Sequence, residues 1–264
     1  MLRQRSLLLL LFVGLLAGGA LPASAQSVDS IVDKMQAQYD KQLESVDTYI
    51  VETNLYTSYN EKVTKDGETT YRSQTKMKGD KGSSFASGTT PSAAYGLQLD
   101  RLKQHATYGG TETINGVTAH VLNVDDPSKV NPDMKTGDAE NMTYYIHAEQ
   151  YVPTRILMNT KGQGRGGPKT SSVTVNMKNF QTVDALTLPY RMEFEFNMDM
   201  SEQEKKQMAM VIQKMENMPE DKSKKMQQMM GNQIEMMKQM LSGEPIVVEV
   251  KNVQVNTDIP DGVF

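Results

Sequence analysis

Leu186–Met198 reads LTLPYRMEFEFNM, and from Arg191 onward polar and apolar side chains alternate. Successive side chains of an extended chain point to opposite faces, so this alternation predicts a β-strand with one apolar and one polar face. The apolar face would carry Met192, Phe194, Phe196 and Met198, and the polar face Arg191, Glu193, Glu195 and Asn197. One dry and one wet face are typical of an antiparallel sheet, so we expect the fold to be organised around one.

Strand and turn signals recur on both sides of this stretch. Lys65-Asp66-Gly67 and Asn115-Gly116 predict hairpin turns. We expect strands over residues 46–57, 68–78, near 83–86, 111–114, 117–124, 142–148, 153–160, 171–183, 186–198 and 245–255. Successive hairpins of this kind form a meander, and a meander of this length curls rather than staying flat.

Two short helical segments accompany the strands. Ser27 or Asp29 can cap a helix over residues 27–43, and its narrow apolar stripe predicts that it lies on the sheet. Residues 89–106 contain Leu97, Leu99 and Leu102, which indicate a short helical connector.

A methionine-rich insert, residues 199–243, separates the last two strands. Of the 20 methionines in the chain, 12 fall between residues 198 and 240, among helix-forming Lys, Glu and Gln. Ser201 and Glu204 have the spacing of a capping box, and Pro219 and Gly243 end two helical arms. Apolar residues at helical spacing are Met208, Ile212 and Met215 on the first arm, and Met226, Met230, Ile234, Met237 and Leu241 on the second. We predict a helical hairpin.

Three interpretations of the methionine face can be weighed from the residues alone. The hairpin could pack on the sheet as core, or it could be an adaptable apolar lid or partner surface, a use that suits the flexible methionine side chain. Thioethers also bind Cu(I), but no His or Cys joins these methionines. We therefore predict no metal site.

The N-terminus has the pattern of a secretory signal peptide. Arg3 and Arg5 precede the apolar run Leu7–Leu16, and Ala23-Ser24-Ala25 is a small-residue cleavage signal. We expect cleavage near Ala25 and a soluble, exported, periplasmic protein. Without these residues the chain has 26 basic and 32 acidic side chains, a balance that argues against a nucleic-acid partner. The absence of cysteine excludes disulfides and thiolate chemistry.

Catalytic and cofactor-binding patterns are missing from the sequence. The glycine-rich stretch 162–170 resembles a phosphate-binding loop, but Pro168 interrupts it and a strand, not a helix, is expected to follow. His105, His120 and His147 are scattered, and we expect structural roles for them. We predict a non-enzymatic protein without a cofactor.

Several segments, taken in order, resemble the periplasmic outer-membrane lipoprotein-sorting proteins, the LolA/LolB-like family. They are Ile31–Tyr39 leading into Val46–Val51, Ile114–Val124, Tyr144–His147 followed by Tyr151–Arg155, Val183–Arg191, and Val255–Phe264. The resemblance implies an unclosed, strongly curved β-barrel with helices in its concavity. It also implies an apolar hollow that takes up acyl chains without chemistry. The methionine-rich insert is an addition to that pattern.

The expected fold is therefore α+β: a strongly curved antiparallel sheet forming a half-barrel over residues 26–264, with an N-terminal helix and a helical hairpin covering the open side. The expected function is binding or carrying lipid or lipoprotein acyl chains, with transient membrane contact. The alternative is an envelope protein interaction or sensing module that docks through the hairpin. Candidate ligand-binding residues are Val51, Leu55, Met177, Met192, Phe194 and Phe196 on the sheet and the eight hairpin residues named above.

Overall fold

The computed structural model describes residues 26–65, 67–78, 98–114, 116–131, 134, 139–164, 167–217, 234, 237–239 and 241–264. The expected signal peptide and the expected short strand near 83–86 lie outside these residues. The elements are α1 (Val28–Ser45), β1 (Thr48–Thr53), β2 (Tyr56–Lys65), β3 (Glu68–Met77), α3 (Leu99–His105), β4 (Ala106–Ile114), β5 (Val117–Val124), a 3₁₀ turn (Pro127–Lys129), β6 (Asn141–His147), β7 (Pro153–Gly164), β8 (Gly167–Val183), β9 (Leu186–Met198), α4 (Glu202–Glu216) and β10 (Ile246–Val255).

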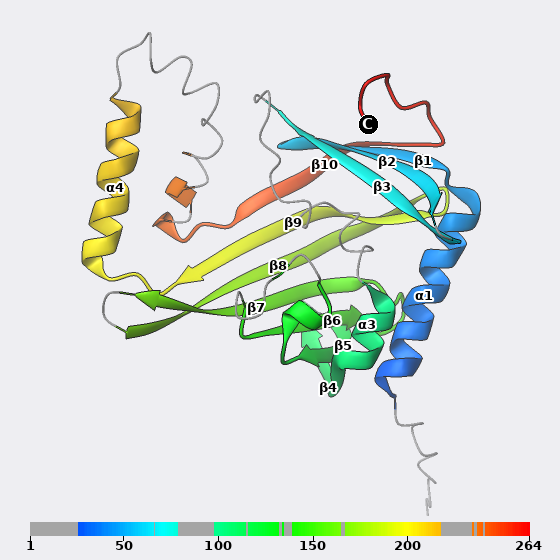
Figure 1. The fold of residues 1–264 in the computed structure, drawn as a ribbon, viewed down its shortest axis with the longest axis horizontal. Helices are drawn as coiled ribbons and strands as arrows, with labels where there is room; N and C mark the ends of the chain where they lie inside the picture. Colours follow the sequence, from blue (N-terminus) through cyan, green and yellow to red (C-terminus); the bar gives the residue numbers. More distant parts are fainter. Residues whose placement is uncertain are drawn as a thin grey trace, which may run out of the picture.

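The ten strands form one antiparallel sheet in the order β3-β2-β1-β10-β9-β8-β7-β6-β5-β4. The sheet does not close, and Figure 1 shows it curving so that β1–β3 and β4–β6 lie on opposite sides of the long strands β7–β9. The predicted α+β half-barrel is confirmed. The predicted meander holds from β4 to β10, but β1 pairs with β10. Consecutive strands β3 and β4 therefore lie at the two opposite edges.

The prediction of one long first strand over residues 46–57 is wrong, because the chain turns at Asn54 and Leu55. Thr53 Oγ1 accepts hydrogen bonds from the backbone N–H groups of Leu55 and Tyr56, at 3.1 and 2.9 Å. The Asn54 side chain donates to the Val247 carbonyl at 2.9 Å and accepts from the Glu249 N–H at 2.8 Å. These side chains bond to backbone groups that would otherwise pair between strands, and the segment is thereby divided into β1 and β2.

The N-terminal helix covers one part of the sheet. Ser27 caps α1 by accepting a hydrogen bond from the Ser30 N–H, as its position in the sequence predicts. The buried α1 residues Ile31, Val32 and Met35 belong to a cluster with residues of α3, β5 and β6: Leu99, Leu102, Leu122, Val124, Met142, Tyr144 and Ile146. We call the face of the sheet that carries this cluster the inner face.

The first arm of the methionine-rich hairpin is α4. It begins with the predicted capping box: Ser201 Oγ accepts from the Glu204 N–H, and the Glu204 carboxylate accepts from the Ser201 N–H at 2.8 Å. α4 stands at the end of the sheet where β9 ends and β10 begins (Figure 1). Residues 234, 237–239, 241 and 242 of the second arm are also helical.

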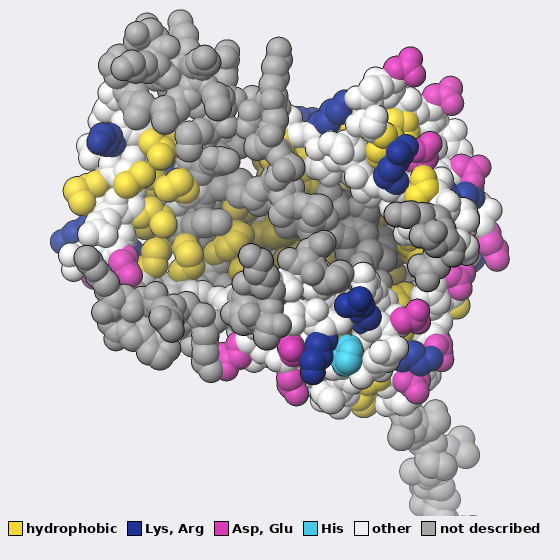
Figure 2. Space-filling model, viewed as in Figure 1, with side chains coloured by type: hydrophobic (Ala, Val, Ile, Leu, Met, Phe, Trp, Pro, Cys, Tyr) yellow, Lys and Arg dark blue, Asp and Glu magenta, His cyan; other side chains and the backbone are white. Residues whose placement is uncertain are grey.

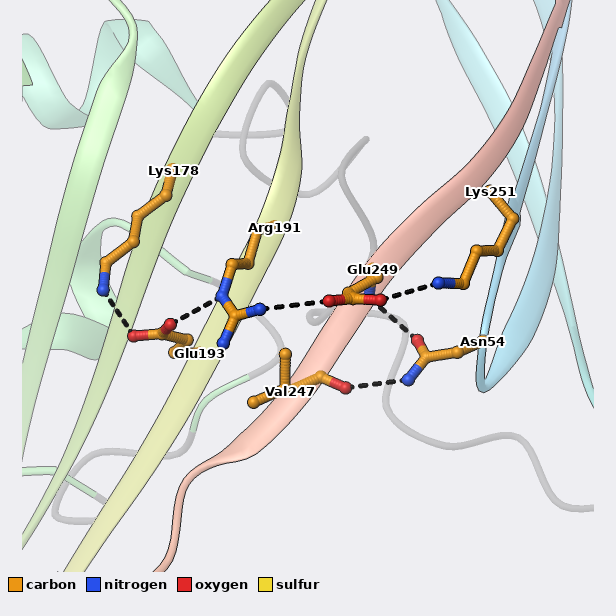
Figure 3. A network of polar contacts seen from close by, with 7 residues as sticks. All are labelled: Asn54, Lys178, Arg191, Glu193, Val247, Glu249 and Lys251. Atoms are coloured by element: carbon orange, nitrogen blue, oxygen red, sulfur yellow. Dashed lines mark hydrogen bonds and ion pairs between the residues drawn. The ribbon is translucent and has the colours of Figure 1, made fainter.

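The outer face of β8, β9 and β10 carries a row of alternating charges (Figure 3). Glu193 accepts from Lys178 Nζ at 2.6 Å and from Arg191 Nε at 2.7 Å. Glu249 accepts from Arg191 Nη1 at 3.0 Å and from Lys251 Nζ at 2.6 Å. Single exposed ion pairs contribute little to stability, but this row joins three strands through shared partners.

This charged row predicts acid sensitivity. Hydrogen bonds from Lys178 and Arg191 hold the pKa of the Glu193 carboxyl below its ordinary value of 4.5. A carboxyl whose pKa is lower in the folded than in the unfolded state stabilises the fold above the unfolded pKa, and this contribution is lost as the pH falls through the folded pKa. We expect the urea midpoint of the wild-type protein to fall as the pH drops from 6 towards 3, and Glu193→Gln to flatten this dependence. The exposed Glu244→Gln should keep the wild-type profile; equal slopes for Glu193→Gln and wild type would contradict the assignment.

Candidate functional site

A second hydrophobic cluster lies on β8, β9 and β10. The alternation of side chains along β9 places Met192 and Phe194 on the inner face. The pairing of β9 with β8 and β10 aligns both with residues of those two strands. One row across the strands is Met177, Met192 and Val248; the next is Val175, Phe194 and Ile246. Phe196 is partly buried against the same cluster. We call these seven residues the apolar sheet face.

The apolar sheet face and the cluster under α1 lie on the same side of the sheet. Ile156 of β7 packs against both clusters, which joins them through one side chain. The inner face is therefore apolar from the strands beneath α1 to β10. The outer face of the same three strands carries the charged row of Figure 3.

Exposure along this apolar surface rises towards α4. Met192 is 1 % exposed and Phe194 7 %, whereas Phe196 and Met198 are partly exposed. On α4, Met210 is 59 % and Val211 45 % exposed. Figure 2 shows hydrophobic side chains gathered on α4 and continuing as a band towards the middle of the molecule. An apolar strip thus runs from a closed core to an accessible end.

The two arms of the hairpin meet around a small cleft. Ile212 on α4 and Ile234 on the second arm are both buried, at 5 % and 8 % exposure. The cleft, about 300 Å³, lies between the arms and is lined by Ala209, Ile212, Gln213, Glu216, Lys238, Leu241 and Ser242. Glu216 and Lys238 form an ion pair of 2.6 Å across the arms. This contact joins the described part of the second arm to α4.

The predicted ligand-binding residues fall into separate regions. Met177, Met192, Phe194 and Phe196 come together on the apolar sheet face, and Leu55 packs against it. Met208, Ile212, Met215, Ile234, Met237 and Leu241 lie on the hairpin, and among the described residues no hydrophobic cluster joins them to the sheet. Val51 is fully buried in a third cluster with Tyr49 and Leu186. Met226 and Met230 lie outside the described residues.

Sequence reasoning missed three contributors to the apolar sheet face cluster. Ile246 and Val248 on β10 are buried there, and so is Tyr56 at the start of β2. The alternation Ile246, Val248, Val250 against Glu249 and Lys251 could have identified the β10 pair. The sequence pattern did not identify Tyr56, because the turn at Asn54 changes which side chains of this segment face inward. Burial raises the pKa of the Tyr56 phenol well above its ordinary value.

Polar chemistry is sparse in the described part of the chain. It contains no group of three His, Asp or Glu side chains that could hold a metal ion. The sequence predicts strands that end at residue 160 and begin again at residue 171, but the pairing of β7 with β8 continues through this glycine-rich stretch to Gly164 and Gly167. His147 Nδ1 accepts from the backbone N–H groups of Glu149 and Gln150 at 3.1 and 3.3 Å, a structural role in a turn.

Helices able to cross a membrane are not found among the described residues. No protein-family model matches the chain, and no curated protein matches it.

Solved structures with a similar course of the chain exist. A DUF1329 family protein from Desulfovibrio piger is 10 % identical, with 89 % of this chain and 96 % of that chain covered and a TM-score of 0.43. An outer membrane lipoprotein-sorting protein domain from Vibrio parahaemolyticus is 10 % identical, with 89 % and 95 % covered and a TM-score of 0.45. A LolA superfamily protein from Nitrosomonas europaea is 12 % identical, with 91 % and 98 % covered and a TM-score of 0.40.

The likeness concerns the fold alone. The unclosed antiparallel sheet with helices that the sequence segments predict is the architecture of this chain. At this identity the comparisons carry no ligand, partner or site residue over to this protein.

Proposed function

We propose that this protein is a periplasmic, non-catalytic binder or carrier of lipid or lipoprotein acyl chains, which it holds against the apolar sheet face. The observation that carries the proposal is the apolar sheet face, which is buried at Met192 and Phe194, becomes partly exposed at Phe196 and Met198, and is continued by hydrophobic side chains on α4 (Figure 2). Contiguous apolar surface that stays accessible is typical of a site that receives an apolar ligand, a membrane or a protein partner.

The driving force would be apolar burial, about 25 cal/mol for each Å² removed from water. An alkyl chain makes no directional bonds, so flexible methionine side chains can adjust to it. α4 suits a movable cover, because Ile212 is its one buried residue. The charged row on the outer face keeps that side of the sheet in water, which leaves the inner face for the ligand.

The expected signal peptide supports the same proposal. The leader-like residues 1–25 would place the protein outside the cytoplasm, where acyl chains must cross water between membranes. Partners would then be a lipid or an acylated protein, with brief membrane contact during transfer.

The direct test is titration of the purified chain with a dansyl-labelled fatty acid. The protein has no tryptophan, so its own emission comes from tyrosine and interferes little. We expect a saturable rise in dansyl emission that unlabelled palmitate reverses. Dansyl emission that rises linearly with added fatty acid, without saturation and without reversal by palmitate, would contradict the proposal.

A second candidate function is docking of an envelope protein on α4. It is favoured by Met210 and Val211, which are exposed on this helix. A docking module predicts no saturable fatty-acid binding at all, whereas a carrier should keep this binding in Met210→Ser. The same titration therefore separates the two functions.

A further inference from the structure

His120 is a buried histidine that Tyr151 links to the N-terminal half of α1. It lies on β5, two residues from Leu122 and so on the same inner face, and it is 4 % exposed. Its Nδ1 atom is 3.4 Å from the Tyr108 hydroxyl of β4. Its Nε2 atom is buried and has no hydrogen-bond partner among the described residues. A buried titratable group with one unsatisfied nitrogen calls for an explanation.

Tyr151 connects His120 to α1. The two rings are stacked, with centroids 6.1 Å apart and planes 21° from parallel. Lys34 of α1 donates from Nζ to the Tyr151 hydroxyl at 2.7 Å, and this Nζ is 4.5 Å from the ring centroid. Gln26, just before the helix, lies 3.5 Å from the same hydroxyl. Tyr151 also has a left-handed backbone (φ 53°), which a non-glycine residue adopts only when its surroundings hold it there.

We propose that His120, Tyr151 and Lys34 form a pH-sensitive latch that holds the N-terminal half of α1 on the sheet and loosens when His120 is protonated. An imidazolium in this position would be a buried charge without a carboxylate partner. It would also place a second cation against the Tyr151 ring that Lys34 already contacts, and the two positive charges repel each other. Moving α1 outward relieves both costs.

The groups around His120 favour its neutral form. They are Lys34 on α1, Tyr108 on β4 and Tyr151 in the turn before β7, and Lys34 is the charged member. Burial, reinforced by the charge of Lys34, lowers the pKa of His120 below its ordinary value of 6.5. The open form regains the ordinary pKa and binds a proton more readily, so the closed form is fully stable above pH 6.5 and loses stability as the pH falls below it.

The latch would control access to the inner face. α1 covers the buried residues of β5 and β6, including Leu122 and Ile146. The C-terminal end of α1 is held separately: the Tyr71 hydroxyl donates to the Val46 carbonyl at 2.8 Å, and the Asn256 side chain donates to the Ser45 carbonyl at 3.0 Å. Next to Lys34, Asp33 accepts from Lys103 of α3 at 2.8 Å, but this is an exposed ion pair of the kind that contributes little to stability and can break when the first turns move. Loosening should therefore be confined to the first turns of α1.

Hydrogen exchange of the full chain tests the latch. We expect protection of amides 28–35, corrected for the intrinsic pH dependence of exchange, to fall between pH 7.5 and 5.5. The fall should reach up to roughly tenfold per pH unit, the limit for uptake of one proton. His120→Phe keeps an aromatic ring for stacking and cannot be protonated, so its protection should be independent of pH. His105→Gln changes an exposed histidine and should behave as wild type.

Two outcomes would overturn the latch. One is the same loss of protection in His120→Phe as in wild type; the other is no loss in wild type. Should His120→Phe fail to fold, NMR titration of the His120 imidazole in the wild-type protein decides: a pKa of 6.5 or above contradicts the latch, and a lower one supports it. These readouts contain no lipid, so their failure is separate from failure of the carrier proposal.

Discussion

Phe194→Ala should lower the free energy of unfolding by about 3–5 kcal/mol, the cost of truncating a buried phenylalanine. Phe194 is 7 % exposed and is aligned with Val175 of β8 and Ile246 of β10. Its loss leaves a cavity at the centre of the apolar sheet face, where three strands meet. Because a domain is stabilised by only about 5–15 kcal/mol in total, this is a large fraction. Urea unfolding followed by far-ultraviolet circular dichroism measures the effect.

Phe264→Ala is the matched control for this change. It removes the same atoms from a side chain that is 43 % exposed and stacks on the Arg72 guanidinium at 4.1 Å. An exposed cation–π contact contributes about 0.5–1 kcal/mol, so we expect a loss of that order. Equal losses for Phe194→Ala and Phe264→Ala would show that the apolar sheet face does not form the packed centre of the sheet.

Phe196→Glu should weaken binding of a fatty acid at least roughly tenfold, equivalent to about 1.4 kcal/mol. Phe196 lies where the apolar sheet face becomes accessible, and it packs against the Met192 and Phe194 cluster without being fully buried. A carboxylate placed there must lose water when an alkyl chain covers it, which costs free energy because no cation lies on this face of β9. The dansyl fatty-acid titration gives the change in Kd.

Asn197→Glu is the control for Phe196→Glu, because it adds the same negative charge one residue further along β9. The Asn197 side chain is exposed and points to the outer face, so a glutamate there does not contact the apolar sheet face. We expect wild-type affinity in this variant. If Phe196→Glu bound as tightly as Asn197→Glu, the ligand would have to lie elsewhere, for example in the cleft between the hairpin arms.

Local sequence rules predicted the parts of the fold that depend on neighbouring residues. Asn115-Gly116 joins β4 to β5, and Ser201 with Glu204 begins α4, because turn and cap geometry is set within a few residues. The break at Asn54 could not be foreseen, since its partners Val247 and Glu249 are more than 190 residues away in the chain. The pairing of β1 with β10 was missed for the same reason.

The candidate site was predicted in part. Period-two alternation identified Met192, Phe194 and Phe196 because one strand contains all three. Helical spacing placed Ile212 on the buried side of α4, but spacing within one element cannot tell which other element it faces. Ile212 contributes to the cleft between the hairpin arms. The relation between sheet and hairpin is a tertiary property that the pattern does not contain.

The methionine-rich insert now has a more definite place. Its first arm follows β9 directly and stands at the accessible end of the apolar strip. The role of this arm as a cover belongs to the carrier proposal, which rests on the exposure of α4 beside Phe196 and Met198.

Native mass spectrometry of protein purified from the exporting cell without detergent tests the central claim most directly. We predict masses above that of the bare chain by one lipid or acyl ligand, and uptake of palmitate or a short acylated peptide when a delipidated sample is challenged. A spectrum with the bare mass alone, unchanged after the challenge, would contradict the carrier function.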